Sequence, residues 1–162
     1  MGGGTGDGRN SATDFLFAGV RMGIVLTDDH GPRGLRGNFE YLGELRPVYY
    51  VLTPRNGDVY AFNGVPIILR WNFKGWHRVS PYGQLAGGVL FSTKDLPPGR
   101  TSMVNFTPQG AAGINIFTKP GQSLVIEFIQ FHHSNADLGL KNPGYNAGFF
   151  FTIGYMWHHG LK

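Results

Sequence analysis

The 162-residue sequence contains no cysteine, which excludes disulfide bonds and thiolate metal sites. It also lacks a run of about 18–20 consecutive apolar residues, so no transmembrane helix is expected. Charged residues make up only 15% of the chain, and no compact basic cluster with interleaved aromatic residues is present, so a nucleic-acid partner is not expected. The net charge of +4 instead suits an anionic lipid surface.

The N-terminal segment also lacks the features of a signal peptide. Residues 1–8 are mostly glycine, with neither a basic start nor an apolar core. We interpret residues 1–12 as a glycine-rich leader, and residues 13–162 as one β-barrel domain. The leader is a candidate for an extra strand or for a strand donated to a neighbour.

What the sequence does contain is 26 glycines, 14% aromatic residues and a persistent two-residue periodicity, all typical of a sheet-rich protein. Turn signals separate seven predicted strands, at residues 13–27, 36–52, 59–73, 79–92, 101–118, 122–134 and 146–158. Most of these exceed the usual length of about 5–6 residues and reach the 9–11 that cross a bilayer at a tilt.

The alternation within the strands indicates which side of each strand faces outward and which faces the lumen. Leu16 and Ile24 share an apolar face of the first strand, while Ile126 and Phe128 oppose Glu127 in the sixth. The minor faces carry charges of both signs, which predicts a polar lumen: Arg21, Glu40, Glu44, Arg46, Arg70 and Glu127. The apolar faces would then contact lipid. A soluble sandwich or lipocalin-like barrel, with the same apolar residues in its core, is the alternative.

The same alternation predicts which residues of the second and third strands face lipid. We expect Tyr49 and Val51 on the lipid-facing side of the second strand, and Val59 and Val65 on that side of the third. Aromatic residues near the strand ends would form interfacial girdles: Tyr49, Tyr50, Trp71, Trp76, Tyr155 and Trp157.

The predicted fold class is an all-β, antiparallel up-and-down barrel of about eight strands. Seven strands are clear, but bacterial single-chain barrels have even numbers of strands, and lipid does not tolerate an unpaired edge. The eighth strand has three possible sources: the leader around residues 7–12, a segment removed by processing, or a neighbouring subunit.

The end of the sixth strand carries the main candidate site. Residues i and i+2 of a strand point to the same face, so His132 and Ser134 would lie side by side. An imidazole there could accept the serine proton, as in a base with its nucleophile. Both residues continue the face assigned to lipid, where a polar pair is costly unless it meets headgroups or substrate. His133 would point to the lumen.

The stretch Phe131-His132-His133-Ser134-Asn135-Ala136, followed by Asn142-Pro143-Gly144 and a final aromatic strand, resembles the C-terminal part of the lipid A 3-O-deacylase family. The resemblance implies an eight-stranded outer-membrane barrel that hydrolyses an ester-linked acyl chain of lipid A. It places the catalytic histidine at His132, the nucleophile at Ser134 and an oxyanion-stabilising residue at Asn135.

The chain departs from that family at one position. The family has a glutamate twelve residues after the serine, where this chain has Asn146. An asparagine can orient the imidazole as in Cys-His-Asn enzymes, but it cannot stabilise the imidazolium by charge. The catalytic set implied by the resemblance is therefore His132, Ser134 and Asn146.

These observations lead to three functional hypotheses. The first is an outer-membrane serine esterase acting on lipid A or a similar glycolipid, with no cofactor and no metal ion. The second is a catalytically impaired barrel of the same family with a structural role, forming a homo-oligomer or filament through strand donation. The third is a soluble lipocalin-like binder of apolar ligands.

Overall fold

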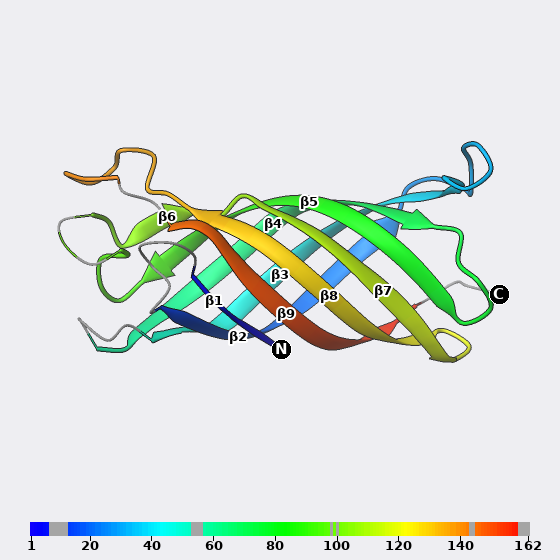
Figure 1. Cartoon of the computed structure of the whole chain (residues 1–162), viewed down its shortest axis with the longest axis horizontal. Helices are drawn as coiled ribbons and strands as arrows, with labels where there is room; N and C mark the ends of the chain where they lie inside the picture. Colours follow the sequence, from blue (N-terminus) through cyan, green and yellow to red (C-terminus); the bar gives the residue numbers. More distant parts are fainter. Residues whose placement is uncertain (7–12, 53–56, 98, 100, 143–144, 159–162) are drawn as a thin grey trace.

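The computed structural model describes residues 1–6, 13–52, 57–97, 99, 101–142 and 145–158, with the side chains of 145–147 left out. These ranges fold as strands (Figure 1): β1 Gly2–Thr5, β2 Asp14–Val25, β3 Gly37–Leu52, β4 Val59–Phe73, β5 Val79–Ser92, β6 Val104–Phe106, β7 Gln109–Lys119, β8 Gln122–His133 and β9 Tyr145–Trp157. Among the described residues, no helix has the length and apolar character needed to traverse a bilayer.

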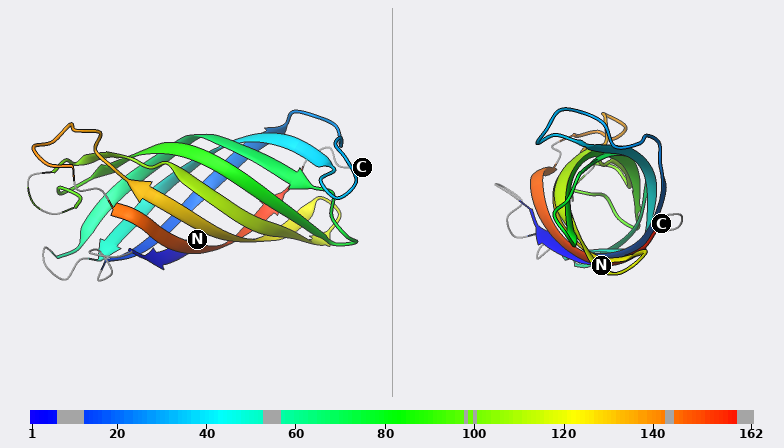
Figure 2. Two further views of the ribbon diagram at one scale, coloured as in Figure 1. Left: turned by 45° about the horizontal axis from the view of Figure 1, so that its top comes forward. Right: turned by 90° about the vertical axis from the view of Figure 1, so that its right-hand side faces the viewer.

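The strands form a ring of antiparallel pairs. Eight of them follow one another around it, in the order β1, β2, β3, β4, β5, β7, β8 and β9, and β9 pairs with β1. The short β6 pairs with residues 89–91 of β5, just beyond residues 79–86, which pair with β7. The end-on view of Figure 2 shows the resulting tube. The prediction of an eight-stranded up-and-down barrel is confirmed.

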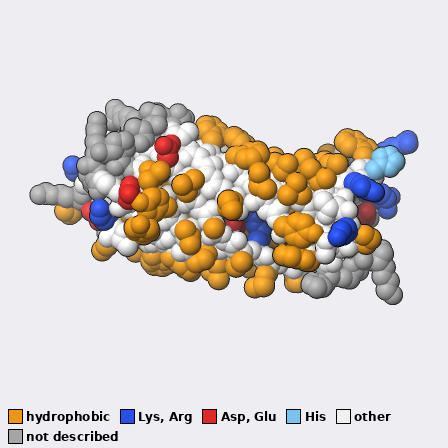
Figure 3. All heavy atoms as spheres, turned by 90° about the horizontal axis from the view of Figure 1, so that it is seen from below, with side chains coloured by type: hydrophobic (Ala, Val, Ile, Leu, Met, Phe, Trp, Pro, Cys, Tyr) orange, Lys and Arg blue, Asp and Glu red, His pale blue; other side chains and the backbone are white. Residues whose placement is uncertain are grey.

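The outer surface of the tube is apolar. Leu16, Ile24 and Phe151 are 52%, 62% and 53% exposed, and along β8 the residues alternate between partly exposed or exposed and buried. Apolar atoms cover most of the middle of the face shown in Figure 3, where a few charged atoms are visible near the centre, and further Lys and Arg atoms lie toward the ends. This arrangement excludes the soluble lipocalin-like alternative, because that fold would enclose these side chains.

The centre of the lumen holds an ionic network, as the minor faces predicted. Arg21 Nη2 lies 2.9 Å from a carboxylate oxygen of both Glu44 and Glu127, and Arg46 Nη2 lies 2.9 Å from Glu44. Glu127 also accepts a 2.8 Å hydrogen bond from the Tyr82 hydroxyl. Each charge removed from water thus has a partner of opposite sign, which burial requires.

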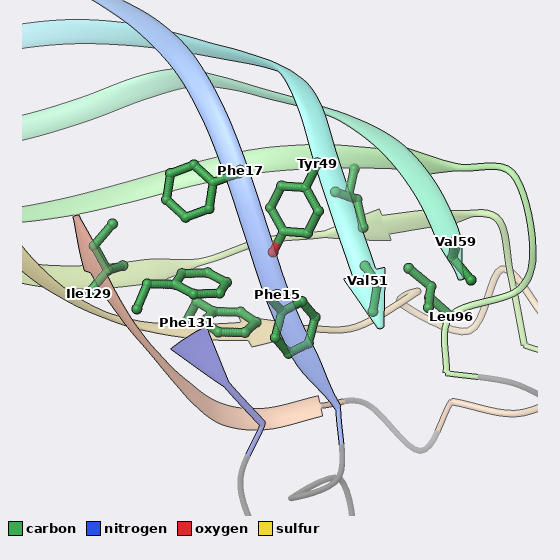
Figure 4. Packing of buried hydrophobic residues seen from close by; sticks show 10 residues of the cluster. Phe15, Phe17, Tyr49, Val51, Val59, Leu96, Ile129 and Phe131 are labelled. Atoms are coloured by element: carbon green, nitrogen blue, oxygen red, sulfur yellow. The ribbon is translucent and has the colours of Figure 1, made fainter. Parts of the chain in front are cut away.

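One end of the lumen is apolar rather than polar, and we call it the site end because β8 finishes there. Its cluster comes from six strands and the loop after β5 (Figure 4). It includes the stacked rings of Phe131 and Phe150, with centroids 3.9 Å apart. Tyr49, Val51 and Val59 belong to this cluster and are buried.

The expected lipid-facing positions of Tyr49, Val51, Val59 and Val65 are therefore wrong. The register of β3 against β4 shifts between Arg46 and Tyr49, and that of β4 against β5 shifts between Gly64 and Ile67. Pro47 and Pro66 lie within these shifts, and proline has no N–H to donate to a ladder. Each irregularity reverses which face the following residues occupy.

Of two further predictions about the strands, one is wrong and the other concerns residues that the structure does not describe. The predicted strand 101–118 is two strands, β6 and β7, because Pro108 interrupts the ladder. The suggested strand around residues 7–12 lies outside the described residues. The eighth member of the ring is β1, which pairs with residues 14–17 of β2 and 149–152 of β9.

The ionic network makes a testable contribution to stability. Replacing Glu127 by alanine leaves Arg21 and Arg70 facing each other without the carboxylate between them, and we expect a loss of about 3–5 kcal/mol of unfolding free energy. Urea titration in detergent, followed by the change in gel mobility on unfolding, measures this loss. Asp28→Ala, which removes a carboxylate from an exposed turn, is the control, and equal midpoints for the two variants would contradict the assignment.

Candidate active site

The end of β8 is held in place by the junction of β6 and β7. Ser134 and Phe106 exchange two backbone hydrogen bonds, of 2.7 and 3.1 Å, and the His132 N–H donates to the Pro108 carbonyl at 3.0 Å. Thr107, between these partners, donates its N–H to Gly88 on β5. The break in the ladder at Pro108 therefore provides the backbone contacts that fix residues 132–134.

His132 and Ser134 both lie on the outer face of the barrel and are partly exposed. The predicted shared face of the two side chains is confirmed, because His133 and Asn135 between and after them are buried. Of the hydrogen bonds between described residues, none joins the two side chains. The Ser134 Oγ instead accepts a 3.2 Å hydrogen bond from the Ala136 N–H, which leaves its hydroxyl hydrogen available for a base.

Asn135 organises the loop that follows β8. Its Oδ1 accepts the Asp137 N–H at 3.0 Å, and its Nδ2 donates to the Lys141 carbonyl at 2.8 Å. Its backbone N–H donates to the side chain of Asn142. The amide group has a second hydrogen that these bonds do not use.

The same loop contains backbone conformations that few residues adopt. Ala136 and Asp137 have φ angles of 47° and 63°, in the left-handed region that disfavours residues other than glycine. At Gly139 an added Cβ would lie 1.8 Å from the Thr101 carbonyl oxygen, so the loop packs directly against the segment before β6. Because such strain persists only where contacts enforce it, the loop has one defined position beside Ser134.

The inner side of the site is apolar and densely packed. His133 points into the lumen, where its Nε2 lies 3.4 Å from the Tyr49 hydroxyl and its ring lies 4.7 Å from that of Phe131. This confirms the expectation that His133 faces the lumen. The aromatic packing supports His132 and Ser134 from behind.

The backbone of Asn146 lies in β9, across from the end of β8. The register pairs Gly148 with Phe131 and Tyr145 with His133, so residue 146 falls between these pairs, at the level of His132. Gly148 is needed at this point, since an added Cβ would lie 2.0 Å from the Phe131 ring. The side chain of Asn146 is outside the described part of the structure. Among the described residues, no three His, Asp or Glu side chains gather to hold a metal ion.

Comparison with known proteins identifies the family. The model of the lipid A 3-O-deacylase (PagL) family matches residues 43–155, which is more than half of the chain. The chain belongs to the PagL family. The crystal structure of the outer membrane enzyme PagL is similar in fold, with a TM-score of 0.65 at 18% sequence identity, and the match covers 96% of each chain. Among curated proteins, no match is found.

This PagL-family protein is therefore an outer-membrane β-barrel, as the outward apolar surface also requires. Sequence reasoning located the His132 and Ser134 pair but missed the residues that position it. Phe106, Pro108 and Thr101 lie far along the chain from Ser134, and only a break in the periodicity at Pro108 signals their role. The hydrogen bond from Ala136 has no signal in the sequence.

The role of Asn135 in the loop can be tested separately from activity. Asn135→Ala removes two side-chain hydrogen bonds within residues 135–142, and we expect protease to cut this loop at least several-fold faster while the barrel keeps its stability. Limited proteolysis in detergent with mass spectrometry measures the rate. Leu140→Ala alters an exposed side chain of the same loop and is the control. Unchanged cleavage in Asn135→Ala would show that other contacts hold the loop.

Proposed function

We propose that this protein is an outer-membrane serine esterase that hydrolyses an ester-linked acyl chain of lipid A or a similar glycolipid. The observation that carries the proposal is the position of His132 and Ser134, side by side on the lipid-facing surface where β8 ends. The Ser134 Oγ accepts the Ala136 N–H, and its own hydroxyl hydrogen is still available to the neighbouring imidazole. Membership of the PagL family supports lipid A as the substrate class.

The outer surface next to the pair suits an acyl chain. Phe128 on β8 and Phe149 on β9 stack with ring centroids 5.3 Å apart, and both are exposed. Phe106 is exposed on the other side of Ser134. Phe128 lies six residues before Ser134, or about 20 Å along the strand at 3.3 Å per residue. An acyl chain could therefore lie along β8 while its ester reaches Ser134.

In the proposed reaction the Ser134 Oγ attacks the ester carbonyl as His132 accepts its proton. A tetrahedral intermediate forms, and its oxyanion accepts a hydrogen bond from the second N–H of the Asn135 amide. His132 then donates the proton to the departing alcohol of the sugar, which leaves an acyl-serine. Water, deprotonated by His132, attacks the acyl-serine, and the protonated His132 returns the proton to the Ser134 Oγ as the fatty acid leaves.

Asn146 has the role of orienting His132 in this scheme. Its place in β9 at the level of His132 supports that role. An asparagine accepts a hydrogen bond from the imidazole through its carbonyl oxygen, which selects the ring tautomer that leaves the other nitrogen free to act as base. Without a carboxylate the imidazolium is less stabilised, so we expect a slow enzyme.

The central test is release of fatty acid from lipid A by the purified protein in detergent, measured by mass spectrometry. Ser134→Ala removes the nucleophile and is expected to reduce release to the uncatalysed level. Ser80→Ala removes a serine hydroxyl near the start of β5, at the other end of the barrel from Ser134, and serves as the control. Undiminished release by a folded Ser134→Ala variant would eliminate Ser134 as nucleophile.

A second test concerns Asn146, which stands where the family has a glutamate. Asn146→Glu restores the acidic residue implied by the family, and we expect kcat to rise by at least about tenfold, within the roughly 10⁴-fold that a triad carboxylate can contribute. The kcat for lipid A hydrolysis measures the gain. Thr118→Glu adds the same charge near the far end of the barrel and controls for net charge. A rate for Asn146→Glu that matches the control would show that residue 146 does not act on His132.

A further inference from the structure

The end of the barrel opposite the site end carries an excess of positive charge. Three connections form it, at residues 26–36, 74–78 and 120–121, together with the ends of the adjoining strands. We call it the basic end, after its exposed lysine and arginine side chains: Arg33, Arg36, Lys74, Arg78 and Lys119. Within these described connections, Asp28 and Asp29 are the only acidic residues. Figure 3 shows Lys and Arg atoms beside His atoms at one end of the molecule, on the right.

The basic side chains of this end make no ion pair with another described residue. The ion pairs between described residues lie in the lumen and join three arginines to three glutamates. The nearby carboxylate of Asp29 instead accepts a 3.1 Å hydrogen bond from the side chain of Asn38. The positive charge of the basic end is therefore not neutralised within the described part of the protein.

Backbone hydrogen bonds hold the two larger connections of the basic end together. The Lys74 N–H donates to the Arg36 carbonyl at 2.6 Å, so the chain at one connection lies directly beside the other. The Trp71 indole donates to the Leu35 carbonyl at 3.2 Å, which fastens the first connection to β4. The positions of these charges are thus set by the fold. We call the two connections the basic arc: residues 26–36 and 74–78.

Exposed apolar side chains lie among the charges of the basic arc. Leu35 and Trp76 are 60% and 77% exposed, and each has two basic residues within two positions along the chain. A segment that mixes basic residues with exposed leucine or tryptophan is typical of binding at an anionic lipid interface, where the charges meet headgroups and the apolar groups enter the acyl boundary.

The tryptophans of the chain also mark this end as a lipid interface. The sequence has three tryptophans, and all of them lie here: Trp71 near the end of β4, Trp76 in the basic arc and Trp157 at the end of β9. Tryptophan is enriched at the level of the lipid headgroups, because its ring is apolar and its N–H is polar. The basic arc is therefore at the depth where lipid phosphates lie.

The lengths of the connections orient the basic end. In outer-membrane barrels short turns face the periplasm and longer loops face outward. Two of the three connections at the basic end, 74–78 and 120–121, are shorter than every chain-reversing connection at the site end: 6–13, 53–58, 93–103 and 134–144. The basic end therefore lies at the periplasmic leaflet, whose lipids are glycerophospholipids, some of them with anionic headgroups.

We propose that the basic arc binds the headgroups of anionic glycerophospholipids. The lipid phosphates lie against the basic side chains beyond the strand ends, while Leu35 and Trp76 lie among the first carbons of the acyl chains. Each Lys or Arg near an anionic lipid surface adds to the attraction, so several in one arc produce a preference for charged lipid. Lipid A also carries phosphates, but it belongs to the outer leaflet, at the site end. The proposal does not depend on the esterase activity.

Tryptophan fluorescence tests the proposal, because all three tryptophans lie at the basic end. The full chain is reconstituted in vesicles of phosphatidylcholine and phosphatidylglycerol, and one lipid at a time carries bromine on its acyl chains, which quenches nearby tryptophans. The two quenching curves give the relative binding constant. We expect phosphatidylglycerol to bind at least about fivefold more tightly, the preference that one basic residue near an anionic surface provides. This preference should fall in about 1 M salt, where the screening length is about 3 Å.

Two matched double variants locate the preference. Arg36→Gln combined with Lys74→Gln removes two charges of the basic arc but keeps the backbone hydrogen bond between these residues, and we expect the preference to fall about twofold or more. Lys94→Gln combined with Lys141→Gln removes the same charge from exposed positions at the site end and should leave the preference unchanged. The difference in quenching between the intact protein and Trp76→Phe reports on the basic arc itself.

Any of three results would overturn the proposal. Equal quenching by the two lipids in the intact protein would mean that the basic arc faces water or a protein. An equal loss of preference in both double variants would mean that net charge, and not the basic arc, attracts the lipid. If lipid A relieves the quenching by brominated phosphatidylglycerol as strongly as unbrominated phosphatidylglycerol does, the basic arc is a surface for lipid A instead.

Discussion

The need to pair every backbone N–H and C=O in lipid governs this structure. It accounts for the closed ring of antiparallel strands, since a tube gives each strand two neighbours. It also accounts for the placement of side chains, because a tube in lipid has an apolar outside and needs a filled inside.

The lumen is filled in two different ways along its length. At the site end, aromatic rings from several strands pack behind His132 and Ser134, and this packing holds the outer face rigid. In the middle, arginine and glutamate side chains join strands that are not neighbours, such as β2 and β8. The ion pairs therefore connect strands that share no backbone hydrogen bonds.

Periodicity predicted most of this fold because the strands are long and each has one lipid-facing side. Leu16, Ile126 and Glu127 are oriented as expected, and six of the seven predicted strands match observed strands within a few residues. The errors occur at prolines. Pro47 and Pro66 lie in register shifts that exchange the two faces, and a pattern read through such a shift places Tyr49 and Val65 on the wrong side.

Some features of the candidate site follow from the sequence of one strand, and others depend on residues distant in the chain. The shared face of His132 and Ser134 depends only on spacing within one strand, so the sequence predicts it. The contacts that fix the pair come from Phe106, Pro108 and Thr101, which the fold brings to the end of β8. These contacts lie at the site end of the barrel, where β1 pairs with both β2 and β9. The geometry around Ser134 therefore depends on residues that a pattern followed along β8 alone does not contain.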